Sequence, residues 1–425
     1  MATRCSSSTS LPLTPSPHPM KAPLQTRKKI YQSLCYVLSE RASLVAWDEF
    51  TPADWELFAR MADREGVAPL MYWKLKDTSK EVPPSTFNFL RSTYYQTLAQ
   101  NTLMYRELER ILEALDEASI PVIVLKGAAL AATVYEDIGL RPMGDLDLLV
   151  KRENLDRAAE TIKTVGFHRV SKDRIPGLNE LIGHAFLLMS NSKQNIAIEL
   201  HWNLIEGSAD WRSPPTDWFW QQSYRVDKVN CRECIGIGWP SLLPVSNLLY
   251  LAAHMMLQHG LSQSRLLWLF DINQLISVRY EEIHWNELIS RAKTFNWVEA
   301  IGITLQEVHN RFKTPVDASA LVSFSVQQNK KAWSFIGAKA RSPETRFLRE
   351  LRTLSTLTWW ARVLLIFSIL FPSPVHVQRQ YNLRSIWLSP VFYIYRWMDI
   401  LMDSLRTLRL AVGGYLRKKS ANQNY

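Results

Sequence analysis

The spacing of apolar positions changes along the chain and divides it into five segments. Residues 1–28 are rich in Ser, Pro and Thr and predict a disordered tail without a signal peptide. From 29 to 117 apolar residues recur at helical spacing, which predicts an N-terminal helical region. Between 118 and 240 short apolar runs alternate with helical stretches, as in an α/β core. Helical spacing returns in a domain at 241–335 and in a C-terminal region at 336–425.

Two strand-like runs of the α/β segment place acidic residues among apolar ones. In DLDLLV, Asp145 and Asp147 are two positions apart, so they share a face of the strand while Leu146 and Leu148 point into the core. In NIAIELHW the same alternation places Glu199 and His201 together. We therefore expect a face of the sheet that carries Asp145, Asp147 and Glu199.

Carboxylates that lie close together repel one another unless a cation binds among them. Hard divalent ions such as Mg²⁺ prefer oxygen ligands, and three carboxylates can hold one or two of them. Two such ions can stabilise the attacking and leaving oxygens of a phosphoryl displacement. Asp145, Asp147 and Glu199 are therefore predicted as metal ligands and catalytic residues, with Mg²⁺ or Mn²⁺ as the cofactor and a nucleoside triphosphate as the substrate.

The triphosphate needs a binding element, and the turn from the first strand into its helix offers one. Gly127 has no side chain, so backbone N–H groups at the start of this helix can approach phosphate oxygens closely. Lys126 adds a charge for the same phosphates. Arg141 either contacts phosphate or closes the turn before Pro142. His201 either orients the substrate or is a core histidine with satisfied hydrogen bonds.

At these residues the chain resembles the uncharacterised nucleotidyltransferase family of the DNA polymerase β-like nucleotidyltransferase superfamily. The resemblance rests on LKGAAL at 125–130, RPMGDLDLLV at 141–150 and IELHW at 198–202, and it covers about 120–275. It implies an α+β fold with a small mixed sheet of polymerase β-like type, embedded in flanking helical regions. It also implies metal binding by Asp145, Asp147 and Glu199. The usual Gly-Ser is Gly127-Ala128 here, so a hydroxyl contact to phosphate is missing.

Other candidate residues give weaker signals. His254 and His259 are five apart, one more than aligns two residues on an α-helix, so a shared metal site is not expected. Arg265 and Asp271 are interpreted as structural. Cys231 and Cys234 form a single CxxC pair without the further ligands of a structural metal site.

The net charge lies at one end of the chain. The whole chain carries +10, and the residues from Lys339 onward supply fourteen Lys and Arg against four Asp and Glu, which is also +10. Aromatic and aliphatic residues recur among these arginines, for example in WLSPVFYIYRW. This region is predicted to associate peripherally with an anionic membrane or with nucleic acid, the membrane being slightly favoured. The alternative is a helical cap with solvated arginines.

The sequence therefore predicts a cytoplasmic enzyme that moves a nucleoside monophosphate from a triphosphate to an unidentified acceptor and releases pyrophosphate. A peripheral location at the membrane is the alternative that depends on the C-terminal region. The longest apolar run, VLLIFSILF at 363–371, is too short to span a bilayer. Two alternatives remain. A sugar-nucleotide glycosyltransferase also uses Asp-x-Asp to hold a metal, but leaves Glu199 without a role. A non-catalytic module that binds a membrane or polymer would have no reason to bury acidic residues.

Overall fold

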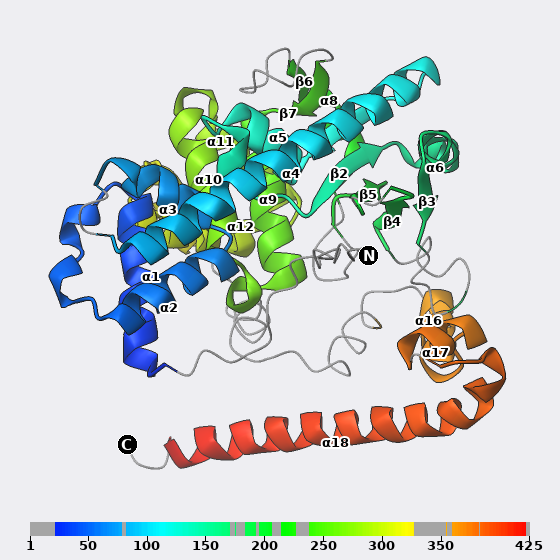
Figure 1. The fold of residues 1–425 in the computed structure, drawn as a ribbon. Helices are drawn as coiled ribbons and strands as arrows, with labels where there is room; N and C mark the ends of the chain where they lie inside the picture. Colours follow the sequence, from blue (N-terminus) through cyan, green and yellow to red (C-terminus); the bar gives the residue numbers. More distant parts are fainter. Residues whose placement is uncertain are drawn as a thin grey trace, which may run out of the picture.

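The structure is a computed structural model of the chain, shown in Figure 1. It describes residues 22–78, 82–170, 175, 183–192, 195–205, 214–226, 238–326, 354, 359–381 and 383–421. The predicted tail lies outside these residues up to position 21, and so does the CxxC pair at 231–234. The described residues confirm the predicted α+β class, with a mixed sheet between helical regions.

The N-terminal region is helical, as its spacing predicts. Its elements are α1 (Leu24–Leu38), η1 (Ala42–Leu44), η2 (Trp47–Glu49), α2 (Pro52–Arg64), α3 (Ala68–Leu75), η3 (Lys76–Thr78) and α4 (Pro84–Glu117). The predicted end of the tail at 28 is a few residues too late, because α1 begins at Leu24. Pro23 stands directly before it, where the missing N–H of proline costs no helical hydrogen bond. Thr51 caps α2 through a reciprocal capping box with Asp54.

Seven strands of the described residues form one mixed sheet in the order β3-β4-β5-β2-β1-β7-β6. They are β1 (Val122–Leu125), β2 (Asp145–Val150), β3 (Phe167–Arg169), β4 (Ala185–Ser190), β5 (Ala197–His201), β6 (Ser223–Val226) and β7 (Trp239–Leu242). Between them lie α5 (Lys126–Thr133), η4 (Ile138–Leu140), η5 (Arg152–Asn154), α6 (Leu155–Thr164) and α8 (Thr216–Gln221). The central pair β2 and β5 runs parallel, and β1 lies antiparallel to β2.

The two faces of the sheet belong to different apolar clusters. Leu146, Leu148 and Ile198 are fully buried in one cluster, together with side chains of α4 and α6. Ile123 and Leu149 point to the other side and join a larger cluster built mainly from helices. Because side chains alternate along a strand, the face of β2 that holds Leu149 is also the face that holds Asp145 and Asp147.

The second helical region follows the sheet and packs against the first. It contains α9 (Pro244–Ala253), the π-helical turn η6 (His254–His259), η7 (Leu261–Gln263), α10 (Leu266–Val278), η8 (Tyr280–Glu282), α11 (Trp285–Thr294), α12 (Val298–Phe312) and α13 (Ala318–Val326). Residues of α1 to α4 and of α9 to α13 form one buried cluster, so these two sequence segments share a core around Trp297. Figure 1 shows them side by side.

The described part of the C-terminal region contains α16 (Trp359–Leu370), α17 (Pro374–Gln380) and α18 (Ser389–Ala421), with η9 (Ile386–Leu388) before the last. Figure 1 shows α18 as a long helix that extends away from α16 and α17. Within the described residues, a single helix long and apolar enough to cross a membrane is not found. The bent pair of α16 and α17, at 55°, could do so by length and composition.

Candidate active site

The pairing of β2 with β5 places the predicted carboxylates on one face. Asp147 is the partner of Glu199, and Asp145 is the partner of Ala197. In a parallel pair, residues opposite each other point to the same side, and residues two apart along one strand do so as well. Asp145, Asp147, Glu199 and His201 therefore share a face, as the alternation of the two sequence runs predicts.

Asp147 lies at the centre of the site. Its Oδ1 accepts a hydrogen bond from Lys126 Nζ at 2.7 Å and another from His201 Nε2 at 2.9 Å. Glu199 Oε2 lies 3.5 Å from His201 Nε2 and 3.8 Å from Lys126 Nζ. Asp147 and His201 are buried, whereas the Glu199 side chain is 38% exposed. Four of the predicted residues thus form one contact network that is open to solvent on the Glu199 side: Lys126, Asp147, Glu199 and His201.

Lys126 reaches this network because of its backbone conformation. It directly follows β1 as the first residue of α5 and has φ of 43°, in the left-handed region that non-glycine residues seldom adopt. A residue held in such a conformation costs about 1–3 kcal/mol and persists only where its surroundings fix it. Here the ion pair with buried Asp147 is that fixing contact. The predicted contact of Lys126 with phosphate remains a prediction.

Gly127 and Arg141 lie against each other. A Cβ atom at Gly127 would lie 2.6 Å from Arg141 Nη1 and 3.3 Å from Met143 Cγ, so the absence of a side chain lets the arginine approach. Arg141 donates to both carboxylate oxygens of Asp271, at 3.1 and 2.8 Å. Its guanidinium therefore joins the turn before β2 to α10. A contact of Arg141 or of Gly127 with phosphate remains a prediction.

Asp271 is structural, as the sequence analysis interpreted it. It also accepts a hydrogen bond from the Tyr135 hydroxyl at 2.7 Å. Asp271 and Arg141 are both buried, and each charge is balanced by the other. The pair holds the second helical region against the segment that carries Lys126 and Asp147.

The local charges give the acidic residues different protonation behaviour. Burial and then the neighbouring Asp147 and Glu199 raise the pKa of Asp145 to about 7. Burial acts in the same direction on Asp147, but the Lys126 ammonium and the hydrogen bond from His201 outweigh it and hold the pKa of Asp147 below its ordinary value. A hydrogen bond from His201 also lowers the pKa of Glu199. Near neutral pH the site therefore holds two firmly ionised carboxylates and a third that titrates.

Imidazole rings that the sequence analysis did not connect line the same side of the site. The His184 ring centroid lies 5.4 Å from that of His201, and the Gln258 amide contacts His184 Nε2 at 3.2 Å. His254 and His259 stand with ring centroids 4.9 Å apart. The rings meet because they lie on a π-helical turn, whose hydrogen bonds join residues five apart. The expectation that these two residues do not share a metal site remains a prediction.

Three of these side chains could hold a metal ion. Among the described residues, Asp147, Glu199 and His201 each offer a ligand atom within 4.8 Å of the others. Asp145 is outside this group, although its charge interacts with both carboxylates. The two carboxylates fit the predicted Mg²⁺ or Mn²⁺, whereas the His201 imidazole is a ligand more typical of zinc and other transition metals. Lys126 contacts the same Asp147 oxygen, so an ion bound there would compete with its ammonium.

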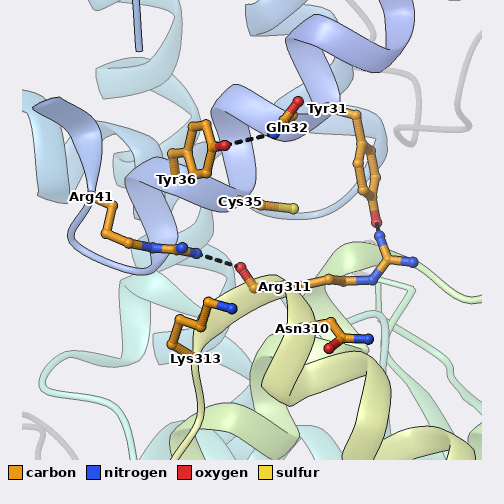
Figure 2. Close-up of a pocket in the computed structure, with 8 residues that line it drawn as sticks. All are labelled: Tyr31, Gln32, Cys35, Tyr36, Arg41, Asn310, Arg311 and Lys313. Carbon is orange, nitrogen blue, oxygen red and sulfur yellow. Dashed lines mark hydrogen bonds between the residues drawn. The ribbon is translucent and has the colours of Figure 1, made fainter. Parts of the chain in front are cut away.

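A separate hollow of about 360 Å³ lies between α1 and the end of α12 (Figure 2). Arg41 donates to the backbone oxygen of Arg311 at 2.8 Å, and Arg311 donates to the Tyr31 hydroxyl at 2.8 Å. Burial raises the pKa of the Cys35 thiol in its wall to about 11, so this thiol stays protonated at neutral pH. The predicted site residues do not line this hollow.

Comparisons with known proteins bear on the segment that carries the site. A family model described as an uncharacterised nucleotidyltransferase matches residues 51–313. No curated protein matches the chain. Two similar solved structures are the antibiotic-resistance factor ANT(2'')-Ia and an antigenic nucleotidyltransferase-like protein from Paracoccidioides brasiliensis. They are 12% and 15% identical and cover 49% and 51% of this chain, and 98% and 95% of their own, each with a TM-score of 0.33.

Proposed function

Because the chain belongs to the uncharacterised nucleotidyltransferase family, we propose that it transfers a nucleoside monophosphate from a nucleoside triphosphate to an acceptor, with Mg²⁺ or Mn²⁺ as cofactor. The observation that carries the proposal is the pairing of Asp147 with Glu199 across two parallel strands, with Asp145 on the same face. In this reaction an acceptor oxygen forms a bond to the α-phosphorus, the bond to the bridging oxygen breaks, and pyrophosphate leaves.

Each side chain of the site has a proposed role in this reaction. Asp147 and Glu199, with Asp145 or His201 beside them, would hold the divalent ion, which when bound polarises phosphate oxygens and stabilises their charge. Lys126 is close enough to Asp147 to exchange that carboxylate for a phosphate oxygen when the triphosphate enters. Asp145 lies on the same face as Asp147 and Glu199 and supplies the third carboxylate charge beside the ion.

The test follows the transferred nucleotide. Purified protein is incubated with each of the four triphosphates labelled at the α-phosphate, with Mg²⁺ or Mn²⁺ and a cell extract, and the labelled product is isolated. We expect label on an acceptor and one pyrophosphate released for each nucleotide transferred. Asp147→Asn should abolish both, whereas exposed Asp156→Asn should not. A parallel incubation uses a sugar nucleotide labelled in its sugar. Label transfer in this incubation alone would instead support the glycosyltransferase alternative.

A second test uses metal binding and does not require the acceptor. Addition of Mg²⁺ or Mn²⁺ should raise the melting temperature, because a ligand that binds only the folded state stabilises it. Asp147→Asn should lose this gain, and Asp156→Asn should keep it. A full metal-dependent shift in Asp147→Asn would show that the ion binds elsewhere.

A further inference from the structure

Helix α16 and the residues 389–405 of α18 expose many of their large apolar side chains. On α16 the buried residues are Ala361, Leu365 and Ser368, which lie three to four positions apart and form one narrow stripe. Trp360, Val363 and Phe367 are among the large side chains that the same helix exposes. Two of the three buried residues, Ala361 and Ser368, are small, whereas most large apolar residues lie outside, as in helices that face lipid rather than water.

An exposed apolar stripe continues along α18. Its members recur at intervals of three and four residues and are each at least half exposed: Val391, Ile394, Tyr395, Met398, Leu401 and Met402. On a water-soluble protein such a stripe is the face that packs against the core. Here it faces outward, and the buried residues of the same helix within this stretch are Ser389 and Arg396.

The break after α16 supplies a second, independent observation. The last carbonyl groups of a helix lack partners within the helix, and in water they are hydrated at little cost. Here Ile369 O accepts from Arg396 Nε at 3.0 Å, and Leu370 O accepts from Trp397 Nε1 at 2.9 Å. Pro372 O accepts from the Tyr393 hydroxyl. Side chains of α18 therefore satisfy the broken end of α16, which is required where backbone bends inside a bilayer.

We propose that α16, α17 and the first half of α18 insert into one leaflet of an anionic membrane as a bent hairpin. The 12 residues of α16 span about 18 Å, slightly more than the roughly 15 Å depth of one apolar leaflet. A bend of 55° separates α17 from the direction of α16, and α18 then returns to the end of α16, where its Arg396 and Trp397 contact the carbonyl groups of Ile369 and Leu370. Trp359, Trp387 and Trp397 supply the aromatic side chains that anchor such segments at the headgroup level.

The charge of this region selects the membrane. Residues from Lys339 onward carry all of the chain's net charge of +10, and Arg417, Lys418 and Lys419 follow one another near the end of α18. A cluster of basic residues beside an inserted segment is attracted to anionic headgroups.

A second copy of the chain would cover these helices less completely than lipid. A coiled coil covers one stripe of each helix, whereas α16 exposes large apolar residues around most of its circumference.

Flotation with vesicles tests the insertion, and it does not depend on the proposed transferase activity. The full chain is mixed with vesicles of phosphatidylcholine alone or with phosphatidylglycerol, and the floated fraction is measured at low and high salt. We expect flotation with both, more with the anionic vesicles, and a bound fraction that resists high salt. Ile394→Asp with Met398→Asp should reduce the salt-resistant fraction at least tenfold, because charged side chains partition poorly into the apolar region.

Leu44→Asp with Val278→Asp is the matched control, since both residues are exposed apolar side chains outside the C-terminal helices. This variant should float like the wild type, and the melting temperature of each variant reports whether it folds. The proposal is overturned if the full chain stays unbound. It is also overturned if high salt releases all of it, or if Ile394→Asp with Met398→Asp converts a dimer to a monomer without changing flotation.

Discussion

Two regions of this protein differ in the burial of their large aromatic side chains. Among the described residues between 22 and 326 most large aromatic side chains are buried or half-buried, with Phe89 and Tyr95 as exposed exceptions, and Trp297 is fully buried in the shared helical core. In the C-terminal helices they lie outside, and Trp387 is 88% exposed. Both regions show apolar residues at helical spacing. The spacing therefore reveals which face of a helix is apolar, but the surrounding contacts decide whether protein or lipid covers it.

The largest expected effect is a loss of nucleotidyl transfer, a property of the first region, without a change in vesicle binding, a property of the second. Asp147→Asn should lower nucleotidyl transfer by about 10³-fold or more, because it removes the charge on which the ion and Lys126 converge. Transfer of α-labelled nucleotide measures the loss. Vesicle flotation should stay at the wild-type value. Loss of both properties in a folded variant would mean that the two regions do not act separately.

Paired tryptophan substitutions test the comparison directly. Trp297→Ala should lower the free energy of unfolding by about 3–5 kcal/mol, since it leaves a cavity in the shared core. Trp387→Ala should change it by no more than about 0.5 kcal/mol and should weaken vesicle binding instead. Denaturant unfolding and flotation give the two values. Equal destabilisation by the two substitutions would place Trp387 inside a core of the protein.

Most of the site could be predicted from sequence because it rests on local rules. Alternation within a strand places Asp145 beside Asp147, and Glu199 beside His201, whatever the neighbouring strands are. The sequence did not indicate that Asp147 would accept hydrogen bonds from both Lys126 and His201. Those contacts depend on the pairing of β2 with β5 and on the left-handed backbone of Lys126, which local spacing does not reveal.

The remaining elements depended on contacts between distant segments. Strands β3, β6 and β7 are short and escaped prediction, because their pairing partners rather than their composition make them strands. The π-helical turn brings the His254 and His259 rings together although α-helical spacing would not, since one extra residue in a turn changes which side chains align. The assignment of Asp271 succeeded, although its partner Arg141 lies 130 positions earlier and was not identified.

Two buried arginines extend the comparison. Arg141 is paired with a carboxylate in the first region, whereas Arg396 donates to a backbone carbonyl and to the Gln380 side chain in the second.

Asp271→Asn should destabilise the protein by about 3 kcal/mol, because it leaves the buried Arg141 guanidinium without its counter-charge. Glu49→Gln breaks the exposed pair with Lys29 and should cost less than about 1 kcal/mol. Chemical denaturation measures both, and equal values would contradict the burial argument.

The smallest expected effect concerns an exception to the apolar interior of the first region. Glu299 on α12 is 7% exposed, and neither of its carboxylate oxygens has a hydrogen-bond partner. Burial raises its pKa from 4.5 to about 7. Between these values the folded state holds a proton that the unfolded chain releases, so the free energy of unfolding should fall as pH rises through this interval.

Glu299→Gln removes this dependence because an amide does not titrate in the interval. Below about pH 4.5 the wild type is protonated in both states, so the variant should have a similar stability there. As pH rises to 7 and above, the wild type must either keep its proton at a growing cost or bury a charge. The variant should then be more stable by roughly 1–3 kcal/mol. Melting curves from pH 4 to 8 measure the difference, with exposed Glu281→Gln as the control. A constant difference at all pH values would mean that Glu299 ionises as readily in the folded protein as in the unfolded chain.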